Sequence, residues 1–141
     1  AQDANVFVIR VGERGRIGET YLIGADGGRS TVRKALDIAS ARFAADPSNA
    51  IAGERLANVY GALAGTTLGL ASAAKDPVEA ARRWRETLSW SRRSLDIWVQ
   101  RREKGTLTAA GQRELDALAA LVAKSEAALK PLDRRRPASS R

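Results

Sequence analysis

The sequence predicts a mostly α protein, with four helices in two related antiparallel helical hairpins and a short β-hairpin before them. Three observations support this fold class. Residues 33–70 and 92–129 are faint copies of each other, 59 residues apart with no gap. From residue 30 onward apolar residues recur with a helical period between cap and break signals. Residues 1–29 instead contain short runs rich in β-branched and aromatic side chains, separated by glycines.

The internal copies keep their apolar positions while most polar positions differ, as expected for two copies of one packing unit. The matching pairs are Arg33 with Arg92, Leu36 with Leu95, Asp37 with Asp96, Ile38 with Ile97, Arg42 with Arg101, Leu56 with Leu115, Val59 with Leu118, Leu63 with Val122 and Leu70 with Leu129. Repeat units bury their apolar faces against their neighbours, and such arrays commonly bind other proteins. The self-similarity therefore points to interaction rather than to chemistry.

The first 29 residues form a segment of their own. Val6, Val8, Ile9 and Val11 lie in the first β-rich run, residues 20–23 form the second, and three glycines lie between them. An isolated two-stranded hairpin is marginally stable in water. We therefore expect it to pack on the helices or to pair with another chain.

Cap and break residues divide residues 30–132 into four helices. These are Ser30 before the first helix, Asp46-Pro47-Ser48-Asn49 between the first and second, Asp76-Pro77 before the third, Gly105 and Thr108 between the third and fourth, and Pro131 at the end of the fourth. In an alternative reading the second helix ends early and Gly65-Thr66-Thr67 is a loop. Residues 133–141 are read as a basic, disordered tail.

Composition excludes several function classes. At 141 residues the chain fits one domain, and without cysteine or histidine it lacks thiolate chemistry, the commonest general base and the commonest transition-metal ligand. We therefore expect no enzymatic activity, no metal and no cofactor. The net charge of +8 comes mostly from arginine and suits either an anionic partner or mixed-charge helix surfaces. No apolar run is long enough to span a membrane.

The helical part resembles tetratricopeptide-type repeats. Leu56 with Tyr60 looks like the first-helix pair of that motif, and Ala80, Trp84 and Thr87-Leu88 look like its second helix, although the spacing between them is longer than in the standard unit. Residues 34–50 and 92–107 also resemble repeats found C-terminal to some bacterial serine/threonine kinases. The resemblance covers residues 30–132 and implies a helical protein-binding repeat without kinase activity.

The third helix has two apolar stripes on a helical wheel. Trp84, Leu88 and Leu95 lie on the broad one, whereas Trp90 and Ile97 lie nearly opposite, among arginines that include Arg93. Ile38 is the repeat equivalent of Ile97 and is likewise off the main stripe of its helix. Either the helix is packed on both sides within the domain or one stripe contacts another molecule. We include Ile38, Trp90, Arg93 and Ile97 among the candidate interface residues.

Two further features are candidates for an interface. Gly61, Gly65 and Gly69 repeat at every fourth position of the second helix, which suggests a smooth path where another helix or subunit approaches closely. The run Arg134, Arg135 and Arg136 could meet an acidic surface or phosphate. Without stacking aromatic residues beside it, this run favours a solvated tail or an inter-subunit ion pair over nucleic acid.

Residues 23–30 resemble the flavin-hydroxylase segment in which an Asp after a strand contacts the sugar chain of the cofactor, and Asp26 matches that Asp. Flavin enzymes of this kind also need an upstream strand, glycine loop and helix for the pyrophosphate. Gly12, Gly15 and Gly18 do not have the required spacing. The interpretation we prefer is that these glycines turn a strand into a capped helix.

Taken together, these patterns predict a non-catalytic structural subunit that binds proteins, above all copies of itself, through strand pairing and helix stacking. The alternative is a monomeric adaptor or regulatory module of a larger bacterial signalling protein. We expect no small-molecule substrate. Residues 1–4 resemble the start left by signal-peptide cleavage, which favours a location outside the cytoplasm, with a cytoplasmic location as the alternative.

Overall fold

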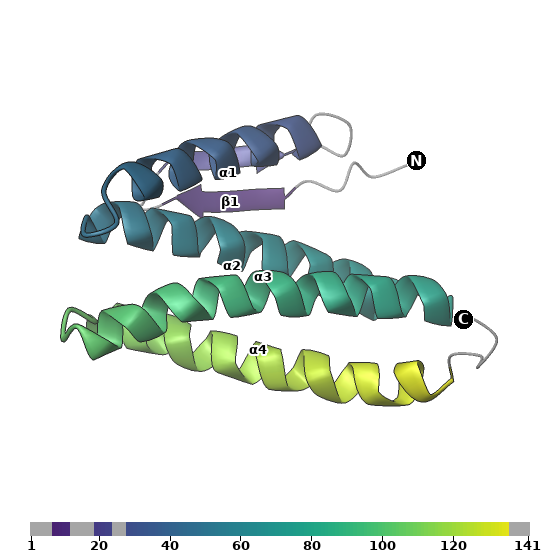
Figure 1. The fold of residues 1–141 in the computed structure, drawn as a ribbon. Helices are drawn as coiled ribbons and strands as arrows, with labels where there is room; N and C mark the ends of the chain where they lie inside the picture. Colours follow the sequence, from purple (N-terminus) through teal and green to yellow (C-terminus); the bar gives the residue numbers. More distant parts are fainter. Residues whose placement is uncertain (1–6, 12–18, 24–27, 136–141) are drawn as a thin grey trace.

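The computed structural model describes residues 7–11, 19–23 and 28–135, with side chains from residue 32 onward. Four helices dominate this part of the chain: α1 (Gly28–Ala45), α2 (Ala50–Ala73), α3 (Pro77–Glu103) and α4 (Ala109–Arg134). Each helix runs antiparallel to the one before it, and the four are stacked in chain order (Figure 1). The protein is therefore mostly α, as the sequence predicts.

Local capping explains where three of the helices start. The Asn49 side chain accepts hydrogen bonds from the backbone N–H groups of Ile51 and Ala52, at 3.0 and 3.1 Å. Asp76 caps α3 in the same way, with Pro77 in the first turn, and Thr108 caps α4. These side chains satisfy backbone donors that have no partner inside the helix. The predicted caps at all three positions are confirmed.

Three helix ends differ from the expectation. α1 begins at Gly28 rather than after Ser30. α2 continues through Gly65-Thr66-Thr67 to Ala73, so the alternative in which these three residues form a loop is wrong. α4 passes through Pro131 and ends at Arg134. A proline so near the end of a helix removes only one backbone hydrogen bond. Asp133, beyond it, accepts a hydrogen bond from Arg85 of α3 at 2.5 Å, which ties the last turn to the bundle.

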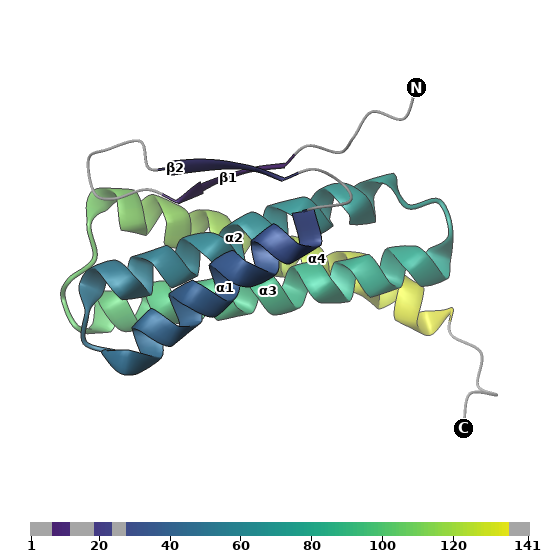
Figure 2. The ribbon, with the colours of Figure 1, turned by 90° about the horizontal axis from the view of Figure 1, so that it is seen from above.

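Two short strands, β1 (Phe7–Val11) and β2 (Glu19–Ile23), pair antiparallel, with Phe7 opposite Ile23 and Val11 opposite Glu19. Figure 2 shows them beside the helix stack, where β1 lies near α2 and β2 near α1. Residues 12–18, the expected loop between them, lie outside the described residues. The β-hairpin as an independent unit stays a prediction.

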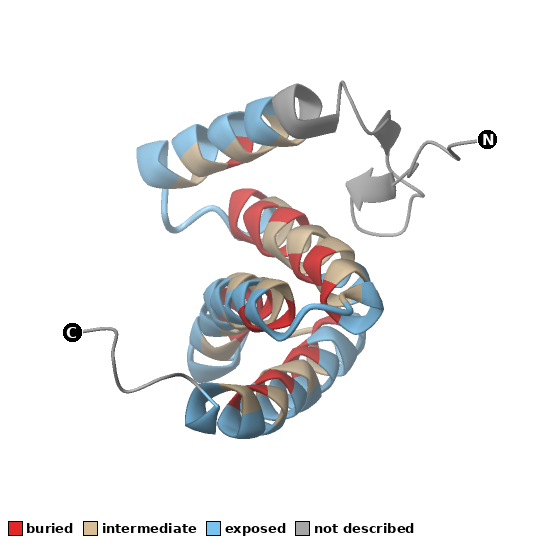
Figure 3. Ribbon diagram, turned by 90° about the vertical axis from the view of Figure 1, so that its right-hand side faces the viewer, coloured by how far each residue is buried: buried red, intermediate tan, exposed pale blue. Residues whose placement is uncertain are grey.

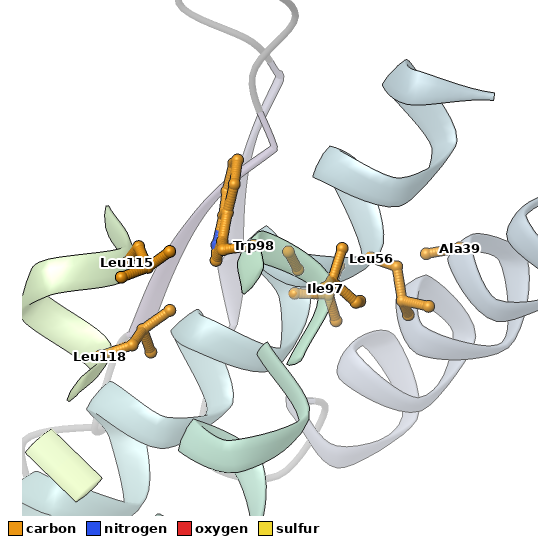
Figure 4. Close-up of a cluster of buried hydrophobic side chains, with 8 residues drawn as sticks. Ala39, Leu56, Ile97, Trp98, Leu115 and Leu118 are labelled. Atoms are coloured by element: carbon orange, nitrogen blue, oxygen red, sulfur yellow. The ribbon is translucent and has the colours of Figure 1, made fainter. Parts of the chain in front are cut away.

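The core of the bundle has two parts that meet at α3. Trp98 packs with Leu115 and Leu118 of α4, whereas the neighbouring Ile97 points toward Leu56 of α2 and Ala39 of α1 (Figure 4). Buried residues follow the inner sides of the helices, and one side of α1 is exposed from residue 33 to its end (Figure 3). α3 is thus an inner helix of the stack, and α1 is an edge helix.

Candidate interaction surface

Small side chains bring α2 and α3 into close contact. Ala57 and Ala64 of α2, and Thr87, Ser91 and Ser94 of α3, are fully buried. The Ser94 hydroxyl donates a 2.7 Å hydrogen bond to the backbone carbonyl of Ala57. The Thr87 hydroxyl donates a 2.9 Å hydrogen bond to the side-chain hydroxyl of Thr67. Because buried hydroxyls need partners, these bonds fix the alignment of the two helices. We call this contact the α2–α3 seam.

Ile97 and Arg101 complete the seam at its other end. Ile97 is only 7% exposed, because α2 covers the side of α3 on which it lies. Its predicted place at an intermolecular contact is therefore wrong, and the alternative of a helix packed on both sides holds for this residue. Arg101 is 9% exposed, and its guanidinium donates to the backbone carbonyls of Asn49 and Ala50 at the start of α2.

The matching face of α1 has a different environment. Ile38 occupies the position of Ile97 in the repeat, yet it is 55% exposed. Arg42, the equivalent of Arg101, is also exposed. Exposed large hydrophobic residues elsewhere in the described part are Ile51 and Val78, each in the first turn of its helix. Ile38 instead lies in the middle of a helix face, which we call the outer face of α1 (Ala35, Ile38 and Arg42).

A second candidate surface surrounds Trp90. Its ring stacks on Tyr60 of α2, with ring centroids 5.8 Å apart and planes inclined by 26°. The guanidinium carbon of Arg93 lies 5.0 Å from the Trp90 ring and 6.0 Å from the Tyr60 ring. Both aromatic residues are half-buried. Trp90 thus already packs within the chain, and the exposed part of this cluster is a cation over two aromatic rings.

Two of the three predicted interface glycines of α2 lie beside a groove. Gly61 and Gly65, together with Asn58, face Leu118 and Leu121 of α4 across a space of about 340 Å³. At Gly65 and Gly69 an added Cβ would meet no atom within 4 Å, and at Gly61 it would meet only the Ser94 hydroxyl at 3.7 Å. No close helix contact therefore requires glycine at these positions. Their predicted role toward another molecule stays a prediction.

The other predicted interface residues lie at the two ends of the chain. Val8, Ile9 and Val11 belong to β1, whose side chains are not among those described, and Val6 and Arg136 lie outside the described residues. Arg134 lies in the last turn of α4, Arg135 caps it, and both are exposed. The basic tail therefore begins as helix rather than as coil.

Charged side chains lie mostly on the surface of the bundle. Arg82 donates to Glu79 at 2.7 Å, and this hydrogen bond is the main reason that the pKa of Glu79 is below its ordinary value. The same contact raises the pKa of Arg82.

The described residues contain no group of three or more His, Cys, Asp or Glu side chains that could hold a metal ion. Within the same part of the chain, no helix is suited by length and apolarity to cross a bilayer.

Sequence reasoning missed the outer face of α4, formed by Asp116, Ala119, Ala120 and Ala123, all of which are exposed. The repeat could have revealed it, because adding 59 to the seam residues of α2 leads to this face. Ala57 maps to Asp116, Tyr60 to Ala119, Gly61 to Ala120 and Ala64 to Ala123. The signal in the sequence was weak because the face consists mostly of alanines. Alanine is common both in cores and on helix surfaces, so its spacing does not distinguish the two.

Comparison with known proteins gives a match to a family model over the first part of the chain. A family model described as a FAD binding domain matches residues 1–59, which is less than half of the chain. No curated protein and no solved structure matches the chain. The matched range contains Asp26, which lies outside the described residues, together with α1 and the beginning of α2.

Proposed function

We propose that the chain is a non-catalytic protein-interaction subunit that assembles with copies of itself by stacking helical hairpins. The observation that carries this proposal is the contrast between Ile38 and Ile97. One side chain is 55% exposed and its repeat equivalent is 7% exposed. The same face of the repeat is thus buried on α3 and exposed on α1. This difference indicates that another molecule covers the face of α1 that contains Ile38.

The helix boundaries support the view that the two hairpins are repeats. α2 begins at Ala50 and α4 at Ala109, 59 residues later, which is the spacing found in the sequence. Leu56 and Val59 are buried, as are their equivalents Leu115 and Leu118. This agreement favours a tetratricopeptide-like unit present twice, as the resemblance of residues 30–132 implies. Such units gain stability by stacking.

Two other surfaces can contribute to assembly. The Trp90, Tyr60 and Arg93 cluster has the composition of many binding hot spots, since Trp, Tyr and Arg are enriched there. The strands β1 and β2 form a two-stranded sheet, and the edge of such a sheet readily pairs with another chain. Both would add to stacking through α1.

Light scattering coupled to size-exclusion chromatography tests this function. We expect wild-type protein to elute well above the 15.1 kDa of one chain, and the Ile38→Glu variant to shift to the monomer mass. Ile51→Glu is the matched control, because Ile51 is 54% exposed but lies in the first turn of α2. A wild-type monomer at every concentration would contradict self-assembly and favour the monomeric adaptor.

The family match supports a second candidate function, binding of FAD through the N-terminal segment. The match covers residues 1–59 and includes the Asp26 segment that resembles flavin hydroxylases. Fluorescence titration of the purified protein with FAD tests it, with an Asp26→Asn variant as the control for that site. Saturable quenching of the tryptophan fluorescence by FAD in the wild type, lost in Asp26→Asn, would support flavin binding at this segment. No change in the wild-type fluorescence on addition of FAD would refute it.

A further inference from the structure

We infer that assembly is head-to-tail, with the outer face of α4 in one copy docking on the outer face of α1 in the next. This inference rests on the proposed self-assembly and names its two surfaces. The bundle itself holds the template for the contact, because α2 packs on α3 through the seam. α3 corresponds to α1 and α2 corresponds to α4 in the repeat.

The two outer faces match the two sides of the seam position by position. On the α1 side, Ala35, Ile38 and Arg42 correspond to Ser94, Ile97 and Arg101, which α2 covers. On the α4 side, Asp116, Ala120 and Ala123 correspond to Ala57, Gly61 and Ala64. Ala57 and Ala64 are fully buried in the seam, so this packing favours small residues. Ala120 and Ala123 are small as well, whereas Asp116 is larger and charged where the seam has Ala57. Both outer faces are exposed within a single chain apart from Ala35, which is half-buried.

The polar contacts of the seam can be transferred in the same way. Arg101 donates to the backbone carbonyls of Asn49 and Ala50. In the docked pair, Arg42 of one copy reaches the equivalent carbonyls of Thr108 and Ala109 in its neighbour. Ser94 meets Ala57 in the seam, so Asp116 comes opposite Ala35 and next to Lys34. The exposed carboxylate of Asp116 and the exposed ammonium of Lys34 are of opposite charge, which favours this alignment.

The contact joins two different surfaces, so each copy keeps one free face of each kind at the ends of a stack. Such heterologous contacts give open filaments unless the rotation between copies closes a ring. An isologous dimer through α1 alone would instead place Arg42 and Lys34 of one copy against the same basic residues of the other.

Two blocked variants test the pairing. Ile38→Glu blocks the α1 face and Ala123→Glu blocks the α4 face, and both add negative charge, so the two blocked faces repel each other. We expect each variant alone to run as a 15.1 kDa monomer and an equimolar mixture to give a dimer of twice that mass that grows no further. Ala110→Glu, in the first turn of α4, is the control for a new carboxylate on this helix and should assemble like wild type. Circular dichroism checks that the variants are folded.

The outcomes separate the inference from the proposed function. If Ala123→Glu assembles like wild type while Ile38→Glu does not, self-assembly stands, but the outer face of α4 is not the surface that docks on α1. If both variants are monomers and the mixture stays monomeric, the contact is not head-to-tail. If wild-type protein itself is a monomer, the proposed function fails and this inference fails with it.

Discussion

The two helical hairpins carry related sequences but bury them differently. In the first hairpin α1 packs against α2, whereas in the second α3 packs against both α2 and α4. Ile38 and Arg42 are exposed as a result, and their equivalents Ile97 and Arg101 are buried. The position in the stack, rather than the residue type, decides which face of a repeat becomes core.

The hairpins also differ in the residues that they carry at equivalent buried positions. In the second hairpin Trp98 packs against Gly111, where an added Cβ would lie 3.1 Å from the indole ring. The equivalent pair in the first hairpin is Ala39 and Ala52, both buried. Where the second hairpin has a tryptophan and a glycine, the first hairpin has two alanines. The two alanines contribute less apolar volume to the core between α1 and α2. The α1–α2 packing is accordingly the weaker one.

The sharpest way to test this comparison is to shorten both isoleucines. Ile97→Ala leaves a cavity between α3, α2 and α1, and we expect it to lower the free energy of unfolding by about 2–4 kcal/mol. Ile38→Ala removes a half-exposed side chain and should change it by less than about 0.5 kcal/mol in dilute, monomeric protein. Urea unfolding followed by circular dichroism measures both. Equal losses would mean that the two positions have the same environment in solution.

The arginine pair gives a smaller difference in the same direction. Arg101→Met keeps the apolar stem but leaves the carbonyls of Asn49 and Ala50 without their charged donor, at an expected cost of about 2 kcal/mol. Arg42→Met, on the exposed equivalent, should stay within about 0.5 kcal/mol. The same unfolding experiment applies. A loss at Arg42 as large as at Arg101 would show that α1 is covered even in the monomer.

Glycine-to-alanine changes should act with opposite signs in two places. At Gly65 an added Cβ meets no atom within 4 Å, so Gly65→Ala should stabilise α2 by up to about 1 kcal/mol. At Gly111 the Cβ would lie 2.7 Å from Leu107 and 3.1 Å from the buried ring of Trp98, so Gly111→Ala should destabilise the protein by about 1 kcal/mol or more. Thermal unfolding distinguishes the two, and stabilisation by both would mean that Trp98 is loosely packed.

The helices could be predicted from the sequence because their signals are local. Asn49, Asp76 and Thr108 cap helices through hydrogen bonds to residues two or three positions ahead, so neighbours along the chain contain the information. Gly105, with a φ of 71°, ends the α3 region in a conformation that suits glycine. Pro131 misled the prediction, since tertiary contacts of Asp133 hold the helix beyond it.

The candidate site could be predicted only in part, because burial depends on distant residues. Helical periodicity shows that Ile97 and Trp90 lie on the second side of α3, but only the packing of α2 shows that Ile97 is core. Ile38 was identified as the repeat equivalent of Ile97. The repeat also explains its exposure, because α2 covers Ile97 on α3, whereas no helix of the described residues occupies the equivalent place on α1. The outer face of α4 was invisible to periodicity, because alanine satisfies both core and surface positions.

The first turn of α3 contains Glu79, whereas the first turns of α1, α2 and α4 contain no acidic residue. A carboxylate there is favoured by the helix dipole, and Arg82 and Arg83 both donate to it. Because the pKa of Glu79 is lowered in the folded chain, its stabilising effect is present above the ordinary pKa of a glutamate and is lost as pH falls through the lowered value.

Glu79→Gln should therefore lower the melting temperature slightly at neutral pH, and the difference from wild type should vanish in acid. Thermal melts of wild type, Glu79→Gln, Arg82→Gln and the double variant across pH measure this coupling. The effect should be the smallest of those predicted, because the pair is exposed and screened by solvent. A difference that persists at low pH would mean that the substitution acts through something other than the negative charge of Glu79, and the ion pair with Arg82 would then not be what stabilises the start of α3.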